Sequence, residues 1–384
     1  DPTDPLALGE PATLRLSLPG GLPFEAWLDP LDAQDPVDER VVPDRYRGTG
    51  AYGWSRDGDL DLLVEPGSYQ LTAWRGMRYE LDIQDVELGA GQVTELTLTL
   101  DEAYPQPADW VLGDPHMHAS PSADGQCPMD ERILISAARG LQVHFGTDHD
   151  HSADYRPLVG AMGLDDVLKS VVSNEISPVL RGHTNIYPIE PQPNAGNHIG
   201  WSWMNQLVGS TTEQFEQLRA ILGPDFIVQL NHPTDSGMAA AAGWSPGEIK
   251  DPSKWTDDMQ AVEVLNSGEL NEYFDFWQDL VLRGMFLTPT GVSDAHGPTS
   301  GDLGLSSTWL HTPGGLDAFD DQSLIDAIEA GAVIVSRGPF LELSELPGTT
   351  TTGSLTLEVQ ALSPSWIQVD RLLLMQDGEV VEIV

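Results

Sequence analysis

Basic residues are scarce in this chain of 384 residues. Only 18 Lys and Arg stand against 60 Asp and Glu, and the formal net charge is -42. Such a surface repels phosphate backbones and anionic lipid headgroups. The composition therefore excludes general nucleic-acid binding and predicts a solvated acidic surface that keeps the protein soluble.

Cysteine and long apolar runs are also lacking. Cys127 is the only cysteine, so no internal disulfide is possible. No apolar run reaches the roughly 18 residues that a membrane span needs, so we expect no span. The first residues, Asp-Pro-Thr, lack a methionine and a signal-like core, and we expect an exported protein, periplasmic or extracellular. No G-x-S-x-G motif is present, which argues against a serine hydrolase.

The length predicts two or three domains. Residues 1–107 alternate apolar and polar side chains at period two, as in TLRLSL and YQLTAW, and resemble the β-sandwich modules of the carboxypeptidase regulatory domain type. Residues 343–384 are again of β type, with a Asp-Gly turn, and we expect a third, truncated β module.

The segment 108–342 has a different pattern. Apolar strand-like stretches such as LQVHFG and FIVQL alternate with helix-like ones such as MDERILISAARG, where Gly140 is a stop signal. Ser210 and Glu213 have the spacing of a capping box. Repeated units of this kind predict an α/β fold with a mostly parallel sheet, open or closed into a barrel.

All ten histidines lie in this α/β segment or at its edge. His116 and His118, in DPHMHAS, are two residues apart at the end of an apolar strand, and therefore face the same side. The pair alone is weak support for a site, because two polar residues at a loop mouth would look the same. His144 belongs to the opposite face of its strand and is expected to be buried and structural.

Further ligand-type residues follow other predicted strands. His149 follows QVHFGT, His232 follows FIVQLN, and Asp294 and His296 are two apart after MFLTPTGVS. Because the carboxyl ends of parallel strands form one shared site, we expect these side chains to meet. Imidazole and carboxylate ligands suit Zn, Fe or Mn.

A metal site also explains Glu175, which ends the apolar stretch VVSNE shortly before His183. A glutamate can bridge two metal ions, with one oxygen on each. Two cations that share a water lower its pKa enough to give hydroxide near neutral pH. Cys127 precedes a helix, but a structural or incidental role is the better interpretation.

The ordered set HMH, ADG, GTDH, NE, GHTN, NHP, SDAHG and SRGPF, over roughly 110–342, resembles the PHP (polymerase and histidinol phosphatase) superfamily. Within it, the sequence is most similar to the carbaryl-hydrolase-like branch, whose members also carry flanking β modules. The resemblance implies a distorted, TIM-like (β/α)7 barrel with flanking all-β modules and two or three divalent metal ions.

Carried over to this sequence, the resemblance assigns three sets of ligands. One metal would be held by His116, His118, Glu175 and Asp294. A second would be held by Glu175, His183 and His232, with Glu175 as the bridge. A third would be held by Asp124, His149 and His296, although Asp124 belongs to a predicted loop. Pro115 stands where the family more often has leucine, a change that extended backbone tolerates.

Residues beside the ligands are the remaining candidates. Five of them could orient imidazoles through hydrogen bonds: Asp114, Asp148, Asn185, Asn231 and Ser293. Local turn or capping roles are the alternative for Asn185 and Ser293. His151 is a candidate proton donor to the leaving group, beside Glu175 and Asp294 as catalytic residues. The candidates for substrate contact are His198, Arg181 and Arg337, with salt bridges as the alternative for the arginines.

The resulting prediction is a metal-dependent hydrolase acting on a small molecule. A phosphoesterase with an anionic ester substrate ranks first, because metal ions stabilise the charge that develops on phosphate oxygens. Hydrolysis of a carboxyl ester, carbamate or amide is the alternative. A non-catalytic surface binding protein is a second alternative, disfavoured because so many buried polar ligands are costly to fold without metal.

Overall fold

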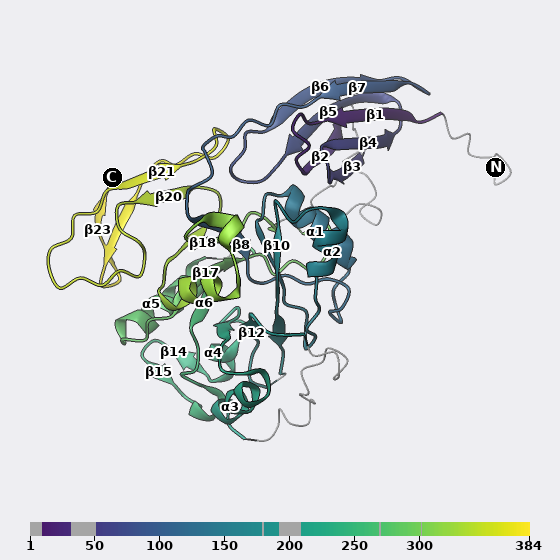
Figure 1. The fold of residues 1–384 in the computed structure, drawn as a ribbon. Helices are drawn as coiled ribbons and strands as arrows, with labels where there is room; N and C mark the ends of the chain where they lie inside the picture. Colours follow the sequence, from purple (N-terminus) through teal and green to yellow (C-terminus); the bar gives the residue numbers. More distant parts are fainter. Residues whose placement is uncertain (1–9, 32–50, 179, 192–208, 269, 301) are drawn as a thin grey trace, which may run out of the picture.

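The computed structural model describes residues 10–31, 51–178, 180–191, 209–268, 270–300 and 302–384. It is a mixed α/β structure in which a central α/β region carries β strands from both ends of the chain on its flank (Figure 1). Among these residues, no helix has the length and apolar character to cross a membrane.

The N-terminal strands form two small sheets. The sheet β4-β1-β7 comprises Asp59–Val64, Ala12–Ser17 and Val93–Thr97, and the sheet β3-β2-β5-β6 comprises Ala51–Ser55, Phe24–Pro30, Gly67–Trp74 and Asp82–Leu88. Alternate residues of β1 are fully buried and pack against apolar residues of the other sheet. The period-two pattern of this segment is therefore confirmed.

The central strands form two five-stranded sheets. The first has the order β10-β9-β8-β18-β19, with bounds Lys169–Val172, Val143–Gly146, Trp110–Asp114, Ser307–His311 and Val333–Ser336. The second has the order β11-β12-β13-β16-β17, with bounds Asn174–Ile176, Thr184–Tyr187, Ile227–Leu230, Ala261–Asn266 and Thr288–Val292. Each sheet combines a parallel run (β10-β9-β8, β13-β16-β17) with antiparallel neighbours.

Within the described residues these sheets stay open, and a single closed barrel of seven β–α units is not seen. At the seam between β17 and β18, the two strands belong to different sheets. There the Thr308 hydroxyl takes the place of the backbone ladder, since its Oγ1 accepts from Gly291 N–H and donates to Gly291 O, both at 2.9 Å. The mixed α/β character is confirmed. The prediction of a mostly parallel sheet is wrong in part, because each central sheet contains antiparallel as well as parallel strand pairs.

The described residues contain six α-helices: α1 (Met129–Ala138), α2 (Arg156–Met162), α3 (Thr211–Leu222), α4 (Met238–Ala241), α5 (Asn271–Leu282) and α6 (Asp321–Glu329). The capping box of α3 is confirmed, because Ser210 Oγ accepts from Glu213 N–H while the Glu213 carboxylate accepts from Ser210 N–H. Gly140, at φ 76°, follows α1 in the left-handed conformation that a helix stop needs. A two-stranded ribbon, β14 (Trp244–Ser245) with β15 (Glu248–Ile249), follows α4.

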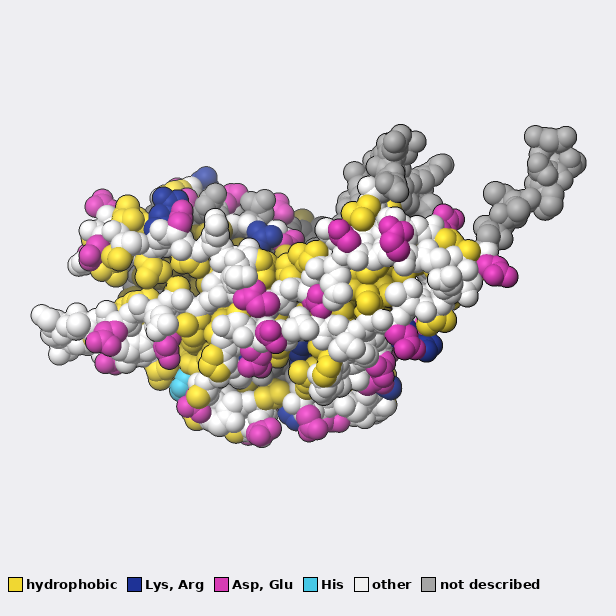
Figure 2. Space-filling view, turned by 90° about the horizontal axis from the view of Figure 1, so that it is seen from above, with side chains coloured by type: hydrophobic (Ala, Val, Ile, Leu, Met, Phe, Trp, Pro, Cys, Tyr) yellow, Lys and Arg dark blue, Asp and Glu magenta, His cyan; other side chains and the backbone are white. Residues whose placement is uncertain are grey.

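The C-terminal strands make two hairpin-like pairs. β20 (Phe340–Leu343) pairs with β21 (Val359–Leu362), and β22 (Leu373–Gln376) pairs with β23 (Glu379–Ile383) across the predicted Asp-Gly turn. This segment reaches the N-terminal sheets, since the Trp366 indole donates to Tyr79 O at 3.0 Å. Figure 2 shows Asp and Glu side chains scattered over one face with few basic ones, as the composition predicts.

Candidate metal centre

Two short segments, around Met117 after β8 and around Ala295 after β17, determine which way the candidate ligands face. They run parallel, with Met117 paired to Ala295, so that His118 N–H donates to Ala295 O and Asp294 N–H donates to His116 O, both at 2.9 Å. Residues two apart face the same side of an extended segment. The pairing therefore directs His116 and His118 from one segment, and Asp294 and His296 from the other, to a common space.

The deeper part of this space is the inner cluster: His116, His118, Glu175, His183, His232 and Asp294. The Nε2 atoms of His116 and His118 lie 3.1 Å apart, and Asp294 Oδ1 lies 3.2 and 3.1 Å from them. On the other side, Glu175 Oε1 lies 3.1 Å from His183 Nδ1 and 3.5 Å from His232 Nε2. The structure thus brings together both ligand sets that share Glu175.

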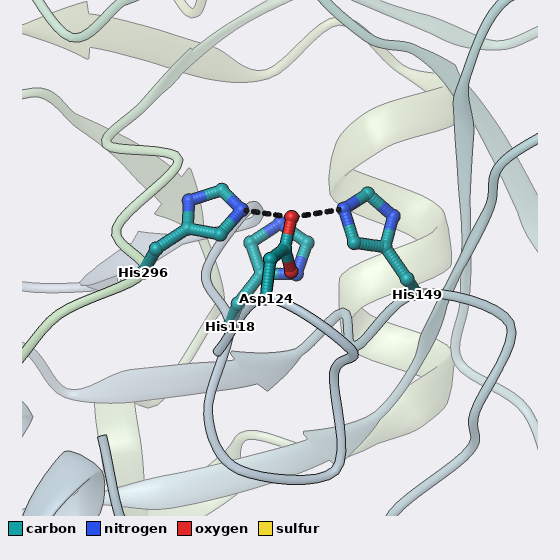
Figure 3. Close-up of side chains that lie close together, drawn as sticks. All are labelled: His118, Asp124, His149 and His296. Carbon is teal, nitrogen blue, oxygen red and sulfur yellow. Dashed lines mark ion pairs between the residues drawn. The ribbon is translucent and has the colours of Figure 1, made fainter. Parts of the chain in front are cut away.

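The outer cluster consists of Asp124, His149 and His296 (Figure 3). Asp124 Oδ2 lies 3.2 Å from His149 Nε2 and 3.3 Å from His296 Nε2, with the His118 ring stacked on His296. Ser122 Oγ donates to Asp124 Oδ1 at 3.0 Å, which draws the loop carrying Asp124 into the cluster. His149 Nδ1 lies 2.7 Å from Glu175 Oε2, so this histidine joins the two clusters.

The donor atoms fit divalent cations. His116 Nδ1 lies 2.6 Å from Glu263 Oε1, and His118 Nδ1 lies 3.1 Å from Ser122 Oγ. Donation from Nδ1–H leaves each Nε2 with a lone pair, and both lone pairs face the Asp294 carboxylate. Three groups with ligand atoms within 4.8 Å of one another are consistent with this fit: His116, His118 and Glu175; His149, Glu175 and His183; and His118, Asp124, His149 and His296.

Burial and carboxylates act in opposite directions on these imidazoles. Burial alone would lower the pKa of His116, but three neighbouring carboxylates raise it well above its usual value. Burial likewise opposes protonation of His149, yet Glu175 and Asp124 raise its pKa to about 9. For His118 burial dominates and lowers the pKa to about 4. Bound cations would replace the protons that these carboxylates otherwise hold on the imidazoles.

Glu263 is a part of the site that the sequence prediction missed. Besides contacting His116, this fully buried glutamate of β16 accepts from His232 N–H at 2.6 Å and from Asn266 Nδ2 at 2.8 Å. An acid within the apolar stretch AVEVLN was the available signal, since a buried carboxylate needs partners. Arg132 was also missed: its guanidinium donates to His118 O at 2.9 Å and to Ala295 O at 3.1 Å, and so supports both ligand segments.

Among the residues predicted to orient imidazoles, Asn231 is the one that forms a hydrogen bond with a candidate ligand side chain within the described part of the chain. Its Nδ2 donates to Glu175 Oε1 at 2.9 Å and to Asn185 Oδ1 at 2.7 Å, while Asn185 Nδ2 holds Pro115 O at 2.8 Å. These bonds fix the carboxylate that the histidines surround.

The two predicted aspartates bind backbone N–H groups instead, and Asp148 Oδ2 also accepts from the Tyr155 hydroxyl at 2.7 Å. Asp114 Oδ1 accepts from the N–H groups of His116 and Ser293, and Asp148 Oδ1 accepts from Ala119 N–H. Burial raises the pKa of Asp114 to about 7 and that of Asp148 to about 6. The imidazoles are oriented by serines that the prediction did not include, with Ser122 on His118, Ser177 on His149 and Ser236 on His232.

The two arginines proposed for substrate contact bind elsewhere in the protein. Arg337 pairs with Asp302 at 2.9 Å, which is the salt bridge weighed as the alternative, whereas Arg181 donates to the backbone oxygens of Gly209 and Ser253. His151 is half-buried, and its N–H donates to Asp148 O. His198 lies outside the described residues.

A cavity of about 1030 Å³ opens beside His149 and His183. Its wall is largely apolar, with Pro178, Leu180 and Ala240 among the lining residues, and its polar groups include the carboxylates of Asp150 and Asp235. No lysine or arginine is among the described residues that line it. The cavity gives a small molecule access to the clusters. Its described wall offers no basic side chain to pair with an anionic group of that molecule that lies away from the clusters.

No family model and no curated protein matches the chain. Among solved structures, it is similar to a two-domain Bacteroides vulgatus protein containing a predicted PHP-like metal-dependent phosphoesterase, at 16% identity over 66% of this chain and 76% of that one, with a TM-score of 0.42. It is also similar to a Chromobacterium violaceum amidohydrolase, at 16% identity over 48% of this chain and 88% of that one, with a TM-score of 0.33. A third similar structure is a Bifidobacterium adolescentis protein described as a predicted metal-dependent phosphoesterase, at 14% identity over 56% of this chain and 95% of that one, with a TM-score of 0.34. Similarities this low do not establish a family.

Proposed function

We propose that the protein is a metal-dependent hydrolase of the PHP type, with two or three divalent ions (Zn, Fe or Mn) at the clusters and its two central sheets as a distorted barrel. One observation carries the proposal. The carboxylate oxygens of a single buried residue, Glu175, lie within 3.5 Å of ring nitrogens of His116, His118, His149, His183 and His232. A structural role does not need five imidazoles around one carboxylate, whereas a bridged metal centre does.

Divalent ions at this centre would lower the pKa of a water molecule and neutralise the charge that develops on the substrate. The chain's own residues hold the geometry. Asn231 fixes Glu175 Oε1, and Glu263 fixes the ring of His116, so neither ligand has to reorganise during the reaction. His151 remains the proposed proton donor to the leaving group.

Phosphoester hydrolysis is the first reaction we propose, on the motif resemblance described above. The cavity favours a second candidate, hydrolysis of a carboxyl ester, carbamate or amide. Its described wall has two carboxylates and no basic side chain, so a substrate with a neutral, apolar group beside the scissile bond fits it better than one with a second anionic group.

The test combines metal analysis with a substrate panel. Purified wild-type protein, supplied with Zn, Fe or Mn, should retain more than one ion per chain, and less than one would overturn the proposal. Nitrophenyl phosphate, bis-nitrophenyl phosphate, naphthyl acetate and naphthyl carbamate then separate the two reaction classes. Turnover of the neutral pair alone would replace phosphoester hydrolysis with the second candidate.

A further inference from the structure

A buried ion pair joins the N-terminal sheets to the central region at a place that the proposed chemistry does not use. Arg139, directly after α1, binds Glu25 of β2 through both carboxylate oxygens, with Nε–Oε2 at 2.7 Å and Nη2–Oε1 at 3.1 Å. Both side chains are fully buried. A bidentate pair of this kind fixes the plane of the guanidinium group as well as its position.

The third nitrogen of Arg139 points away from this pair to the turn that follows His296. Its Nη1 donates to Ser300 O at 2.8 Å and to Leu303 O at 3.1 Å. Ser300 Oγ in turn accepts from the N–H of Gly297, the residue next to His296, at 3.0 Å. A continuous path of hydrogen bonds therefore runs from the N-terminal module to a residue of the outer cluster.

Arg132, from the same helix, holds the near end of this turn by donating to Ala295 O and Gly297 O at 3.1 and 3.0 Å. The His296 side chain is 33% exposed, and its own contacts are with members of the two clusters: the ring stacks on His118, Nε2 lies 3.3 Å from Asp124 Oδ2, and Nδ1 lies 2.8 Å from Asp294 O. The backbone that carries this ring is held by the two arginines.

We propose that Glu25 is a positioning residue for the outer cluster. By fixing the guanidinium of Arg139, Glu25 directs Nη1 to the turn after His296. The N-terminal β module therefore helps to position a ligand of the proposed metal centre. In the inner cluster, the hydrogen bonds to the ligand segments come from Arg132, Asp114 and Asn231. This inference rests on the proposed metal site.

The test is a metal titration of the full chain after removal of metal with a chelator, using Mn²⁺ and Zn²⁺. Wild type should show a tighter and a weaker class of ions, and Asp124→Ala identifies which class belongs to the outer cluster. Glu25→Gln should weaken the outer class by about tenfold or more, in the range seen for residues that orient metal ligands. The inner class should keep its wild-type Kd.

Two further variants separate positioning from general stability. The double variant Glu25→Leu with Arg139→Met leaves no unpaired buried charge, so it should fold even if Glu25→Gln does not. It should weaken the outer class to the same extent as Glu25→Gln. Leu28→Ala, in the buried core of the same strand, loosens the N-terminal sheets without touching Arg139 and should leave the outer class unchanged.

The outcomes are distinct. An outer class with wild-type Kd in Glu25→Gln or in the double variant overturns the inference, and so does an equal loss in Leu28→Ala. Wild-type protein that binds no metal overturns the proposed function, and the inference falls with it for that separate reason.

Discussion

The inner and outer clusters use the same kinds of side chain in different surroundings. In the inner cluster His116, His118 and Glu175 are buried, and His116 Nδ1, His118 Nδ1 and Glu175 Oε1 are bonded to Glu263, Ser122 and Asn231, respectively. In the outer cluster the Asp124 side chain is 54% exposed and comes from a loop. We infer that the two clusters would differ in role once metal is bound. Buried ligands would keep a fixed geometry, whereas exposed ligands would leave coordination positions open to a substrate.

Removing the residue shared by both inner ligand sets should have the largest effect. Glu175→Ala takes away the bridge and leaves several imidazoles facing one another, so we expect kcat/KM to fall by at least about 10³-fold and inner-class metal to be lost. Metal analysis and steady-state kinetics measure this. Glu216→Ala, an exposed glutamate of α3, is the control. Wild-type turnover by Glu175→Ala would show that the bridge is wrongly assigned.

A smaller but more selective change is expected from Glu263→Gln. The amide keeps the shape of the side chain but weakens its bond to His116 Nδ1, so inner-class affinity should drop by roughly 10- to 100-fold. The outer class should not change, because Glu263 contacts none of its members. Titration of the apo-protein checks both. An equal loss in the two classes would remove the distinction between the clusters.

The reverse pattern is expected from Asp124→Ala. Loss of the only carboxylate of the outer cluster should weaken its ion by about 30-fold while the inner class keeps its affinity. The same titration detects it, with Asp130→Ala, in the first turn of α1, as the control. If the inner class also weakens, the two clusters act as one unit.

The smallest effect concerns a histidine outside both clusters. His144 is fully buried on β9 with Ser170 as its partner, and burial lowers its pKa to about 3. Below a pH of about 6.5, the ordinary pKa of histidine, the unfolded chain binds a proton that the folded chain does not, so the free energy of unfolding decreases as the pH falls. Between pH 7 and 5.5 this decrease amounts to about 1.3 kcal/mol. In His144→Gln that part of the decrease should be absent from urea unfolding of apo-protein, and identical slopes would contradict it.

The convergence of the candidate ligands was predictable, because strand ends and period-two spacing determine which way side chains point. The motifs HMH and DAH each predict two side chains on one face of an extended segment. The backbone pairing of Met117 with Ala295 brings these four side chains together. Helix ends such as Ser210 with Glu213 were equally readable, because capping is local.

What the sequence did not reveal depends on contacts between distant segments. In β16 every residue is buried, so alternation does not tell which side Glu263 faces. At the seam between the central sheets, the Thr308 hydroxyl bonds both backbone groups of Gly291, a contact between distant segments that the local sequence does not indicate. Arg181 and Arg337 were candidates for contact with a substrate anion, with salt bridges as the alternative. In the structure Arg337 pairs with Asp302 and Arg181 donates to backbone oxygens, and nothing in their local sequence distinguishes these uses.

The parallel pairing of the HMH and DAH segments has a consequence for how this protein can change. A slip of one residue in that register would turn all four ligand side chains away and expose Met117 and Ala295, which are now buried. Insertions near these segments therefore damage the core and the metal centre together. The residues around the cavity, such as Leu180 and Ala240, lie outside these paired segments, so under the proposed function the substrate could change without any change of the candidate ligands.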